Sequence, residues 1–245
     1  MSCIVPTDPR LSPLDYARSY GGRRVVRQIL RWVVAAALCS AGLTAISGVP
    51  ATAGGKTLKI VALGDSITAG LGLPEKDGFV ARLQAALARQ GIAVEVANAG
   101  VSGDTASDGL ARLDWSVPDD TDAVVLELGA NDMLRGIKPE VTRSALEAIL
   151  RRLSERHITV LLCGMRAAPN LGPDYDHAFA RIYPELAAKY GALLYPFFLE
   201  GVAGDLALNQ PDGLHPNAAG VDAIVARILP KVEELIARIR AQQPS

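Results

Sequence analysis

Residues 58–66 read Leu58-Lys59-Ile60-Val61-Ala62-Leu63-Gly64-Asp65-Ser66, an apolar run that ends in a short polar turn. Such a run is typical of a strand that is buried on both faces of a parallel sheet. Gly64 allows a tight turn, so the pattern predicts that the Ser66 hydroxyl is presented where the strand ends. We expect Asp65 to tie this turn through hydrogen bonds. The alternative interpretation of Ser66 is a serine that caps a helix.

The alternation of short apolar runs with helical stretches continues to the end of the chain. The runs predicted as strands are Leu58–Leu63, Ala93–Ala97, Ala123–Leu128, Thr159–Cys163 and Ala192–Tyr195. The stretches with helical spacing are Gly78–Gln90, Thr105–Leu113, Pro139–Arg156, Asp176–Lys189 and Asn217–Ala241. Alternation on this scale predicts an α/β fold, in which a five-stranded parallel sheet carries helices on both faces.

The first 53 residues differ from the rest of the chain and are predicted to be a cleaved export signal. Six arginines and two aspartates make the start basic, residues 32–49 carry no charge, and Ala51-Thr52-Ala53 precedes Gly54. These are the three parts of a secretory signal. We expect cleavage after Ala53, a single domain over residues 54–245, and a periplasmic location. The alternatives are full secretion and retention of the apolar stretch as a membrane anchor, and the export route stays open.

Charge and cysteine content exclude several functional classes. Residues 54–245 carry 19 of the 25 basic and 24 of the 26 acidic side chains, which gives a net charge of −5. No block of like charge stands out, so we expect no nucleic-acid partner. Cys163 is the only cysteine of these residues and lies in an apolar run, which predicts a buried, inert thiol. One thiol forms no intrachain disulfide and supports no cysteine-based metal site.

Polar motifs follow the predicted strands at four places. They are Gly64-Asp65-Ser66, residues 98–104, Gly129–Asp132 and Asp212–His215. In open α/β sheets, ligands bind beyond the carboxyl ends of the strands. We therefore expect these four segments to meet at one edge of the sheet.

The residues of these motifs fit nucleophilic catalysis by serine. A serine is a weak nucleophile until a positioned base takes its proton, and a third group usually orients that base. Three histidines are available as the base. His157 lies at a predicted helix end and His177 at a predicted exposed helix start, so both are interpreted as structural or surface residues. The sequence predicts Ser66 as the nucleophile, His215 as the base, and Asp212 as the group that orients His215.

Acyl transfer also needs hydrogen-bond donors for the oxyanion that forms on the attacked carbonyl. Gly103 has no side chain and can bring its backbone N–H close, and Asn131 can offer its side-chain amide. With the backbone N–H of Ser66, these residues make a predicted oxyanion hole. Taken alone, Gly103 is equally typical of a turn and Asn131 of a loop. We expect Asp104 to cap the helix that begins near Thr105, and Asp132 to fix the Asn131 loop.

Ser66, Gly103, Asn131 and His215, each in its own motif, resemble the four signature residues of the SGNH hydrolase superfamily, also called GDSL-type esterases. Further motifs narrow the resemblance to the bacterial arylesterase, thioesterase I and lysophospholipase L1 group. These motifs are Ser102–Thr105, Leu126–Asp132, Leu134–Gly136, Ile182–Pro184 and Tyr195–Phe198. The resemblance extends from about Leu58 to Val232. It implies a flavodoxin-like, three-layer α/β/α fold and a serine mechanism that uses no metal and no other cofactor.

The resemblance also implies the class of substrate. Members of this group hydrolyse carboxylic esters and thioesters, including aryl esters, acyl thioesters and lysophospholipids. The loop after Asn131 would bind the acyl chain through Met133, Leu134 and Ile137. We expect a monomer that acts on a small ester or lipid-like substrate, with at most transient contact with membrane lipids. The alternatives are a carbohydrate acetylesterase that acts on acetylated polysaccharide, and a catalytically inactive domain that only binds acyl ligands.

Apolar side chains in the loops favour the lipid-type esterase over the acetylesterase. These side chains are Leu71, Leu73, Met133, Leu134, Ile137 and Leu171. They predict an apolar groove for the acyl chain, although the same residues are also typical of packing inside a domain.

Overall fold

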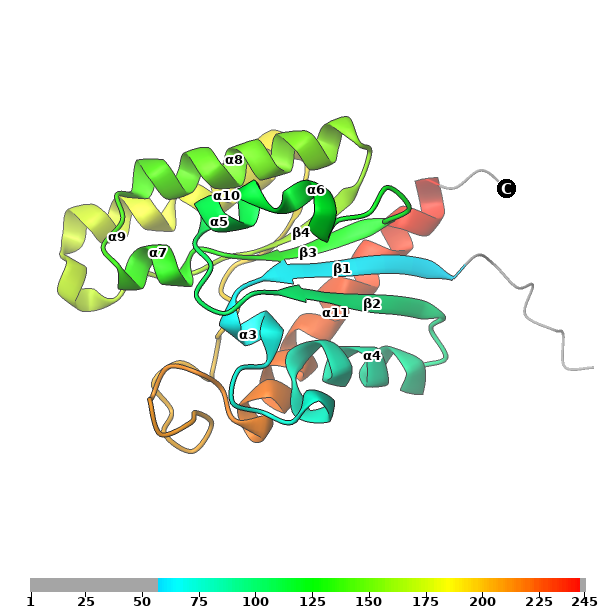
Figure 1. Cartoon of the computed structure of the whole chain (residues 1–245), viewed down its shortest axis with the longest axis horizontal. Helices are drawn as coiled ribbons and strands as arrows, with labels where there is room; N and C mark the ends of the chain where they lie inside the picture. Colours follow the sequence, from blue (N-terminus) through cyan, green and yellow to red (C-terminus); the bar gives the residue numbers. More distant parts are fainter. Residues whose placement is uncertain (1–56, 243–245) are drawn as a thin grey trace, which may run out of the picture. The chain divides into compact units, whose positions relative to one another are not determined.

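A computed structural model of the chain describes residues 57–242, and the predicted export signal lies outside this range. The described residues contain a five-stranded sheet in the order β2-β1-β3-β4-β5 (Figure 1). The strands are β1 (Leu58–Gly64), β2 (Val94–Gly100), β3 (Ala123–Glu127), β4 (Thr159–Cys163) and β5 (Leu193–Tyr195). Every neighbouring pair is parallel, which confirms the predicted α/β fold.

Helices cover both faces of this sheet. Helices α4 (Phe79–Arg89) and α11 (Ala218–Gln242) lie on one face, and α5 (Ala106–Ala111), α8 (Pro139–Glu155) and α10 (Ile182–Tyr190) lie on the other (Figure 1). The shorter elements are α3 (Ser66–Ala69), α6 (Leu113–Ser116), α7 (Ala130–Leu134), α9 (Pro173–Ala180) and two 3₁₀ turns, η1 (Glu75–Asp77) and η2 (Pro169–Leu171). None of the helices within residues 57–242 is long and apolar enough to cross a membrane.

The core is made by the two central strands and the helices that cover them. All five residues of β3 are buried, and so are six of the seven residues of β1. A strand that is covered on both faces shows no alternation of apolar and polar residues, and this explains the continuous apolar runs in the sequence. Cys163 at the end of β4 is fully buried and free, as predicted. Burial raises the pKa of its thiol well above the ordinary value, so the thiol stays protonated.

The structure differs from the predicted helices at two long stretches. The single helix expected over residues 176–189 is two helices, α9 and α10, separated at Arg181. Pro184 explains the break, because a proline has no N–H to donate and is tolerated only in the first turn of a new helix. The helix expected over residues 105–113 is also divided, because α5 ends and α6 begins at Arg112.

Two short helices, α3 and α7, were not expected, and both matter for the site. They begin directly after β1 and just after β3, which are neighbours in the sheet. The chain leaves β1 toward β2 on one side and β3 toward β4 on the other, so this is the switch point of the sheet. Ligands of open α/β sheets bind in the crevice outside such a point. The segment between β5 and α11 returns to the same edge, beside α3 (Figure 1).

Candidate active site

The nucleophile segment is a tight helical turn at the end of β1. Asp65 caps α3, because its Oδ1 accepts a hydrogen bond from the N–H of Ile67 at 3.0 Å. Asp65 therefore ties the turn, as expected, and takes the capping role that the alternative interpretation gave to Ser66. Ser66 is the first residue of α3 and is 7% exposed. Gly70 ends the helix with a φ of 80°, in the left-handed region that favours glycine.

The structure brings together the three residues that the sequence predicts as the catalytic triad. The Oγ of Ser66 lies 2.9 Å from Nε2 of His215, and Nδ1 of His215 lies 2.6 Å from Oδ2 of Asp212. Ser66 and His215 are 149 residues apart in the chain, so the fold itself creates this contact. The other two histidines are elsewhere: His157 follows α8 with a φ of 56°, and His177 lies on the exposed side of α9.

Backbone hydrogen bonds prepare Asp212 for its role. Its Oδ1 accepts from the N–H of His215 at 3.0 Å and from the N–H of Leu214 at 2.9 Å. The N–H and the imidazole of His215 are the main causes that lower the pKa of Asp212 to about 2. Asp212 is thus a carboxylate at any pH near neutral, and its Oδ2 accepts a hydrogen bond from the Nδ1–H of the imidazole. Nε2 is then left to face Ser66 as the base.

The loop that carries His215 is fixed to the rest of the site by Gln210. The backbone N–H of Gln210 donates to the carbonyl of His215 at 2.7 Å. Its side-chain amide donates to the carbonyls of Leu71 and Pro216, at 2.8 and 3.0 Å. Because Leu71 lies two residues after the end of α3, Gln210 connects the base segment with the nucleophile segment.

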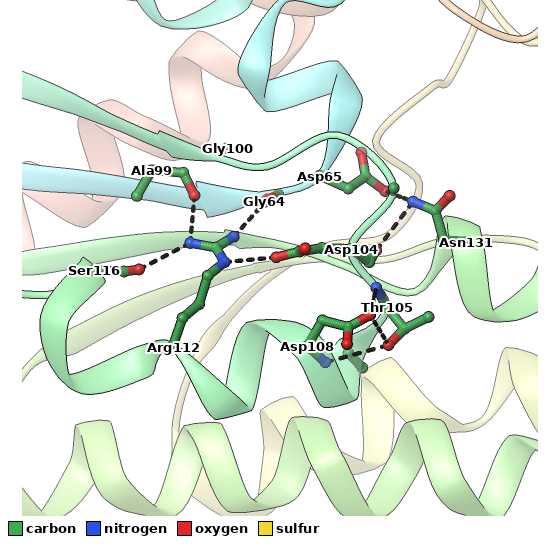
Figure 2. A network of polar contacts seen from close by, with 12 residues as sticks. Gly64, Asp65, Ala99, Gly100, Asp104, Thr105, Asp108, Arg112, Ser116 and Asn131 are labelled. Carbon is green, nitrogen blue, oxygen red and sulfur yellow. Dashed lines mark hydrogen bonds and ion pairs between the residues drawn. The ribbon is translucent and has the colours of Figure 1, made fainter.

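Asn131 lies in α7, with its side chain turned toward the nucleophile turn (Figure 2). Its Nδ2 donates to Oδ2 of Asp65 at 3.1 Å and to the backbone carbonyl of Asp104 at 3.0 Å. Gly103, which precedes Asp104, has a φ of 89°, and its carbonyl accepts from Arg135 at 2.7 Å. The predicted oxyanion donors therefore lie on segments that are joined to each other by hydrogen bonds.

The expectation for Asp104 was wrong, because Thr105 caps α5 instead. The Thr105 side chain accepts from the N–H of Asp108, and the Asp108 carboxylate accepts from the N–H of Thr105, which is a capping box. The Asp104 carboxylate forms an ion pair with Arg112 at 2.5 Å. Asp132 has the structural role that we expected, since it accepts from the N–H of Ala106 at the start of α5.

A second buried carboxyl group, Glu127, lies beneath the nucleophile turn. Glu127 is fully buried at the end of β3, and its Oε2 accepts from the Thr68 hydroxyl at 2.7 Å and from the N–H of Asp65 at 3.3 Å. Its Oε1 has no hydrogen-bond partner among residues 57–242. Burial, and next the charge of Asp65, raise the pKa of Glu127 well above its ordinary value. Burial also raises the pKa of Asp65, to about 6. At neutral pH Glu127 thus holds the proton of this pair and Asp65 the charge.

The loop predicted to bind the acyl chain is only partly open to solvent. Leu134 is 53% exposed, whereas Met133 packs against the core and Ile137 is half-buried. The carbonyl of Ile137 accepts a hydrogen bond from the Tyr175 hydroxyl at 2.8 Å, which fixes the end of the loop to α9.

No role is predicted from the sequence for Arg112, Glu127 or Arg135, although all three contact residues of the site. Glu127 stands inside an apolar run, and a charged residue in a strand buried on both faces is a signal of a paired or protonated group. Arg112 and Arg135 lie on predicted helical or loop segments, where a basic residue is ordinary. Nothing in their spacing indicates the contacts that they make.

The matching family model is the GDSL-like lipase/acylhydrolase family, and it covers residues 62–223. Esterase TesA of Pseudomonas aeruginosa is 40% identical over 201 residues, which cover 82% of this chain and 99% of that protein. The thioesterase 1/protease 1/lysophospholipase L1 of Escherichia coli K12 is 37% identical over 64% of this chain and 75% of its own length. The crystal structure of AlinE4, an SGNH-hydrolase family esterase, is 46% identical, covers 74% of this chain and 97% of its own, and has a TM-score of 0.62.

The family match extends over the segments that hold Ser66, Gly103, Asn131 and His215, and over the end of β1 and strands β2 to β5. The family match spans well over half of the chain, and the relatives are esterases and a thioesterase. The chain therefore belongs to the GDSL-like lipase/acylhydrolase family of ester hydrolases.

Proposed function

We propose that this chain hydrolyses carboxylic esters and thioesters, among them aryl esters, acyl thioesters and lysophospholipids, through an acyl-enzyme on Ser66. The observation that supports this most directly is the unbroken hydrogen-bond chain from Asp212 through His215 to Ser66, at 2.6 and 2.9 Å. A base within hydrogen-bond reach of a serine, itself oriented by a carboxylate, is the arrangement that activates a hydroxyl for attack.

The reaction has two stages that use the same base. His215 takes the proton of Ser66 while Oγ attacks the acyl carbonyl, and the tetrahedral intermediate then expels the alcohol or thiol, which receives that proton from His215. In the second stage His215 takes a proton from water, which attacks the acyl-enzyme. The intermediate releases the carboxylic acid, and Ser66 recovers its proton from His215. The charge on Asp212 stabilises the imidazolium that forms in each stage.

The oxyanion receives hydrogen bonds from the backbone N–H groups of Ser66 and Gly103 and from the amide of Asn131. One such donor contributes about 3 kcal/mol to stabilisation of the transition state. Both N–H bonds of the Asn131 amide have acceptors in the protein, Asp65 and the carbonyl of Asp104. To reach the oxyanion, the Asn131 amide either shares one of these two hydrogens between the acceptor and the oxyanion, or gives up one of the two hydrogen bonds. Before substrate binds, the two acceptors hold the amide in a fixed orientation.

Exposed apolar side chains support an acyl chain as the substrate group. Each segment that carries a proposed catalytic or oxyanion residue also exposes one apolar residue: Leu71 is 46% exposed, Val101 44%, Leu134 53% and Leu214 51%. The acyl chain contacts this apolar surface, and Leu134 contributes more to binding than the inward-packed Met133. The names of the relatives, an esterase and a thioesterase/lysophospholipase, agree with such substrates.

The cellular setting is part of the same proposal. Residues 1–53 direct export and are removed, and residues 54–245 form one domain that acts in the periplasm as a monomer. Its partners are small ester or lipid-like substrates, with transient contact with membrane lipids and no nucleic acid. The reaction needs no cofactor and no metal, because His215 and the oxyanion donors supply the chemistry.

Hydrolysis of p-nitrophenyl esters from acetate to palmitate tests this function. Residues 54–245 should hydrolyse medium or long chains, Ser66→Ala should lose turnover, and Asn131→Ala should lose about 100-fold to 1,000-fold in kcat. Activity that is confined to acetate would instead favour the carbohydrate acetylesterase. Undiminished hydrolysis by a folded Ser66→Ala variant would refute the mechanism, and acyl binding without hydrolysis of any ester would indicate a binding domain.

A further inference from the structure

The guanidinium of Arg112, at the junction of α5 and α6, joins three segments of the site (Figure 2). Its Nη2 donates to the carbonyl of Gly64 at 2.9 Å, and its Nη1 donates to the carbonyl of Ala99 at 2.9 Å. Nη1 also donates to the Ser116 hydroxyl at 2.9 Å, and Nε forms the ion pair with Asp104. The side chains of Arg112 and Asp104 are each only 12% exposed.

Two of these contacts, to Gly64 and Asp104, lie close to a proposed oxyanion donor in the chain. Gly64 ends β1 two residues before Ser66, so the contact to its carbonyl fixes the strand from which the nucleophile turn begins. Asp104 follows Gly103 directly, so the ion pair holds the loop that presents the Gly103 N–H. The carbonyl of Asp104 accepts from Asn131 at 3.0 Å, and this contact carries the constraint to the third donor.

The geometry points to Arg112 as a positioning residue for the oxyanion hole, an inference that rests on the proposed function. Arg112 makes no contact with Ser66 or His215 in the hydrogen bonds and ion pairs of the described residues, so it acts through the segments that it holds. A planar guanidinium can serve acceptors in several fixed directions at once, whereas a lysine offers one compact charge. Arg112→Lys can therefore keep the charge opposite Asp104 but cannot hold Gly64, Ala99 and Asp104 together.

Arg112→Lys should slow the chemical step and leave substrate binding unchanged. We expect Arg112→Lys to lower kcat for a p-nitrophenyl ester by about 10-fold to 100-fold, the scale of a small misplacement of catalytic groups. KM should stay within about threefold of the wild-type value, since loss of an interaction made only in the transition state lowers kcat and kcat/KM together. A trifluoromethyl ketone forms a tetrahedral adduct with the serine, so the variant should bind it more weakly than the wild type does, by the same factor as the loss of kcat. The product fatty acid forms no such adduct, and the variant should bind it as tightly as the wild type does.

Arg156 offers a matched control at the opposite edge of the sheet. It also holds two backbone carbonyls, those of Val117 and Pro118, at 2.7 and 3.0 Å, and contacts Asp119. These residues precede β3, away from the carboxyl ends of the strands. Arg156→Lys should lower thermal stability by an amount comparable to Arg112→Lys but should keep the wild-type kcat.

Asp104→Asn provides a second variant, because it leaves the Asp104 carbonyl in place and removes only the ion pair. The inference predicts that Asp104→Asn lowers kcat and leaves KM unchanged, with a smaller loss of kcat than in Arg112→Lys.

Wild-type kcat in folded Arg112→Lys and Asp104→Asn would overturn the inference. An equal loss in Arg156→Lys, or a rise in KM alone, would also overturn it. If Arg112→Lys does not fold, Asp104→Asn decides the question by the same criteria. Activity that survives in Ser66→Ala would refute the proposed function itself, and this control separates the two failures.

Discussion

At the scale of single residues, the proposed catalytic groups Ser66 and His215 lie within hydrogen-bond distance of each other, and buried groups hold the segments around them. Ser66, Asp212 and His215 were predicted because each chemistry-bearing side chain follows a recognisable strand or turn. Arg112 and Glu127 were given no role, because their partners come from strands and loops that are far apart in the chain. Their contacts with Gly64 and Thr68 exist only after the sheet has formed.

Glu127→Gln tests the assignment of the proton in the buried carboxyl pair. Glutamine keeps the shape of a protonated glutamate, and its oxygen can accept the hydrogen bonds from Thr68 and Asp65. At pH 5, where Glu127 is protonated in the folded protein, the substitution should change the free energy of unfolding by less than about 1 kcal/mol. Urea unfolding at pH 5 and pH 8 would measure this change.

The pH dependence of stability should differ between the wild type and this variant. The pKa of Glu127 is raised in the folded protein, so above its unfolded value the folded state binds more protons than the unfolded state. The free energy of unfolding then falls as the pH rises from about 4.5 toward the pKa that Glu127 has in the folded protein. It falls by about 1.4 kcal/mol for each pH unit in this range. Glu127→Gln should flatten this fall and be more stable than the wild type at pH 8. A variant that is less stable at pH 8 would show that Glu127 is charged.

At the scale of elements, long runs with a clear period were predicted well and short polar elements were not. The five strands were found within a few residues, because burial on both faces leaves a continuous apolar signal. Strand β2 extends beyond the predicted run, through Asn98 and Ala99 to Gly100. Hydrogen bonds to β1, and not apolar burial, hold this extension in the sheet. The short helices α3 and α7 have too few residues to show a helical period.

The close approach of β2 to α3 gives a prediction for Gly100→Ala. A Cβ at residue 100 would come within 2.7 Å of backbone atoms of Ala69 and Thr68, so α3 would have to move. Because Ser66 begins α3, we expect about a 10-fold or greater loss of kcat together with a lower melting temperature. Gly78→Ala is the control, since its nearest neighbour would lie at an ordinary 3.4 Å. Equal kcat in the two variants would show that α3 tolerates the shift.

At the scale of the whole molecule, the order of the strands decides which motifs meet. The order β2-β1-β3-β4-β5 places the ends of β1 and β3 side by side, so Ser66 and Asn131 come to one edge of the sheet although they lie on separate segments. The rule that ligands bind beyond the carboxyl ends of the strands predicts this edge from the sequence, whereas the switch point is known only from the strand order. It could not predict the Asp65–Asn131 contact, which depends on how the two side chains are oriented.

The boundary of the exported protein gives a prediction at this scale. If residues 1–53 are removed during export, the N-terminus of the enzyme from the periplasmic fraction should be Gly54. Intact-mass spectrometry of that fraction measures it directly. An Ala53→Leu variant should accumulate unprocessed chain, because a large side chain does not fit the small-residue cleavage pattern. A full-length chain in the membrane fraction of the wild type would instead support the anchor.

The central claim is that Ser66 forms the covalent intermediate, and a p-nitrophenyl alkylphosphonate tests it most directly. Attack of the serine oxygen on phosphorus releases one p-nitrophenolate and leaves a stable phosphonyl ester on the enzyme. We predict one equivalent of p-nitrophenolate for each molecule of residues 54–245, loss of esterase activity, and the added mass on the peptide that contains Ser66. Ser66→Ala should release none. Label on any other residue, or esterase activity that persists after complete labelling of Ser66, would contradict the claim.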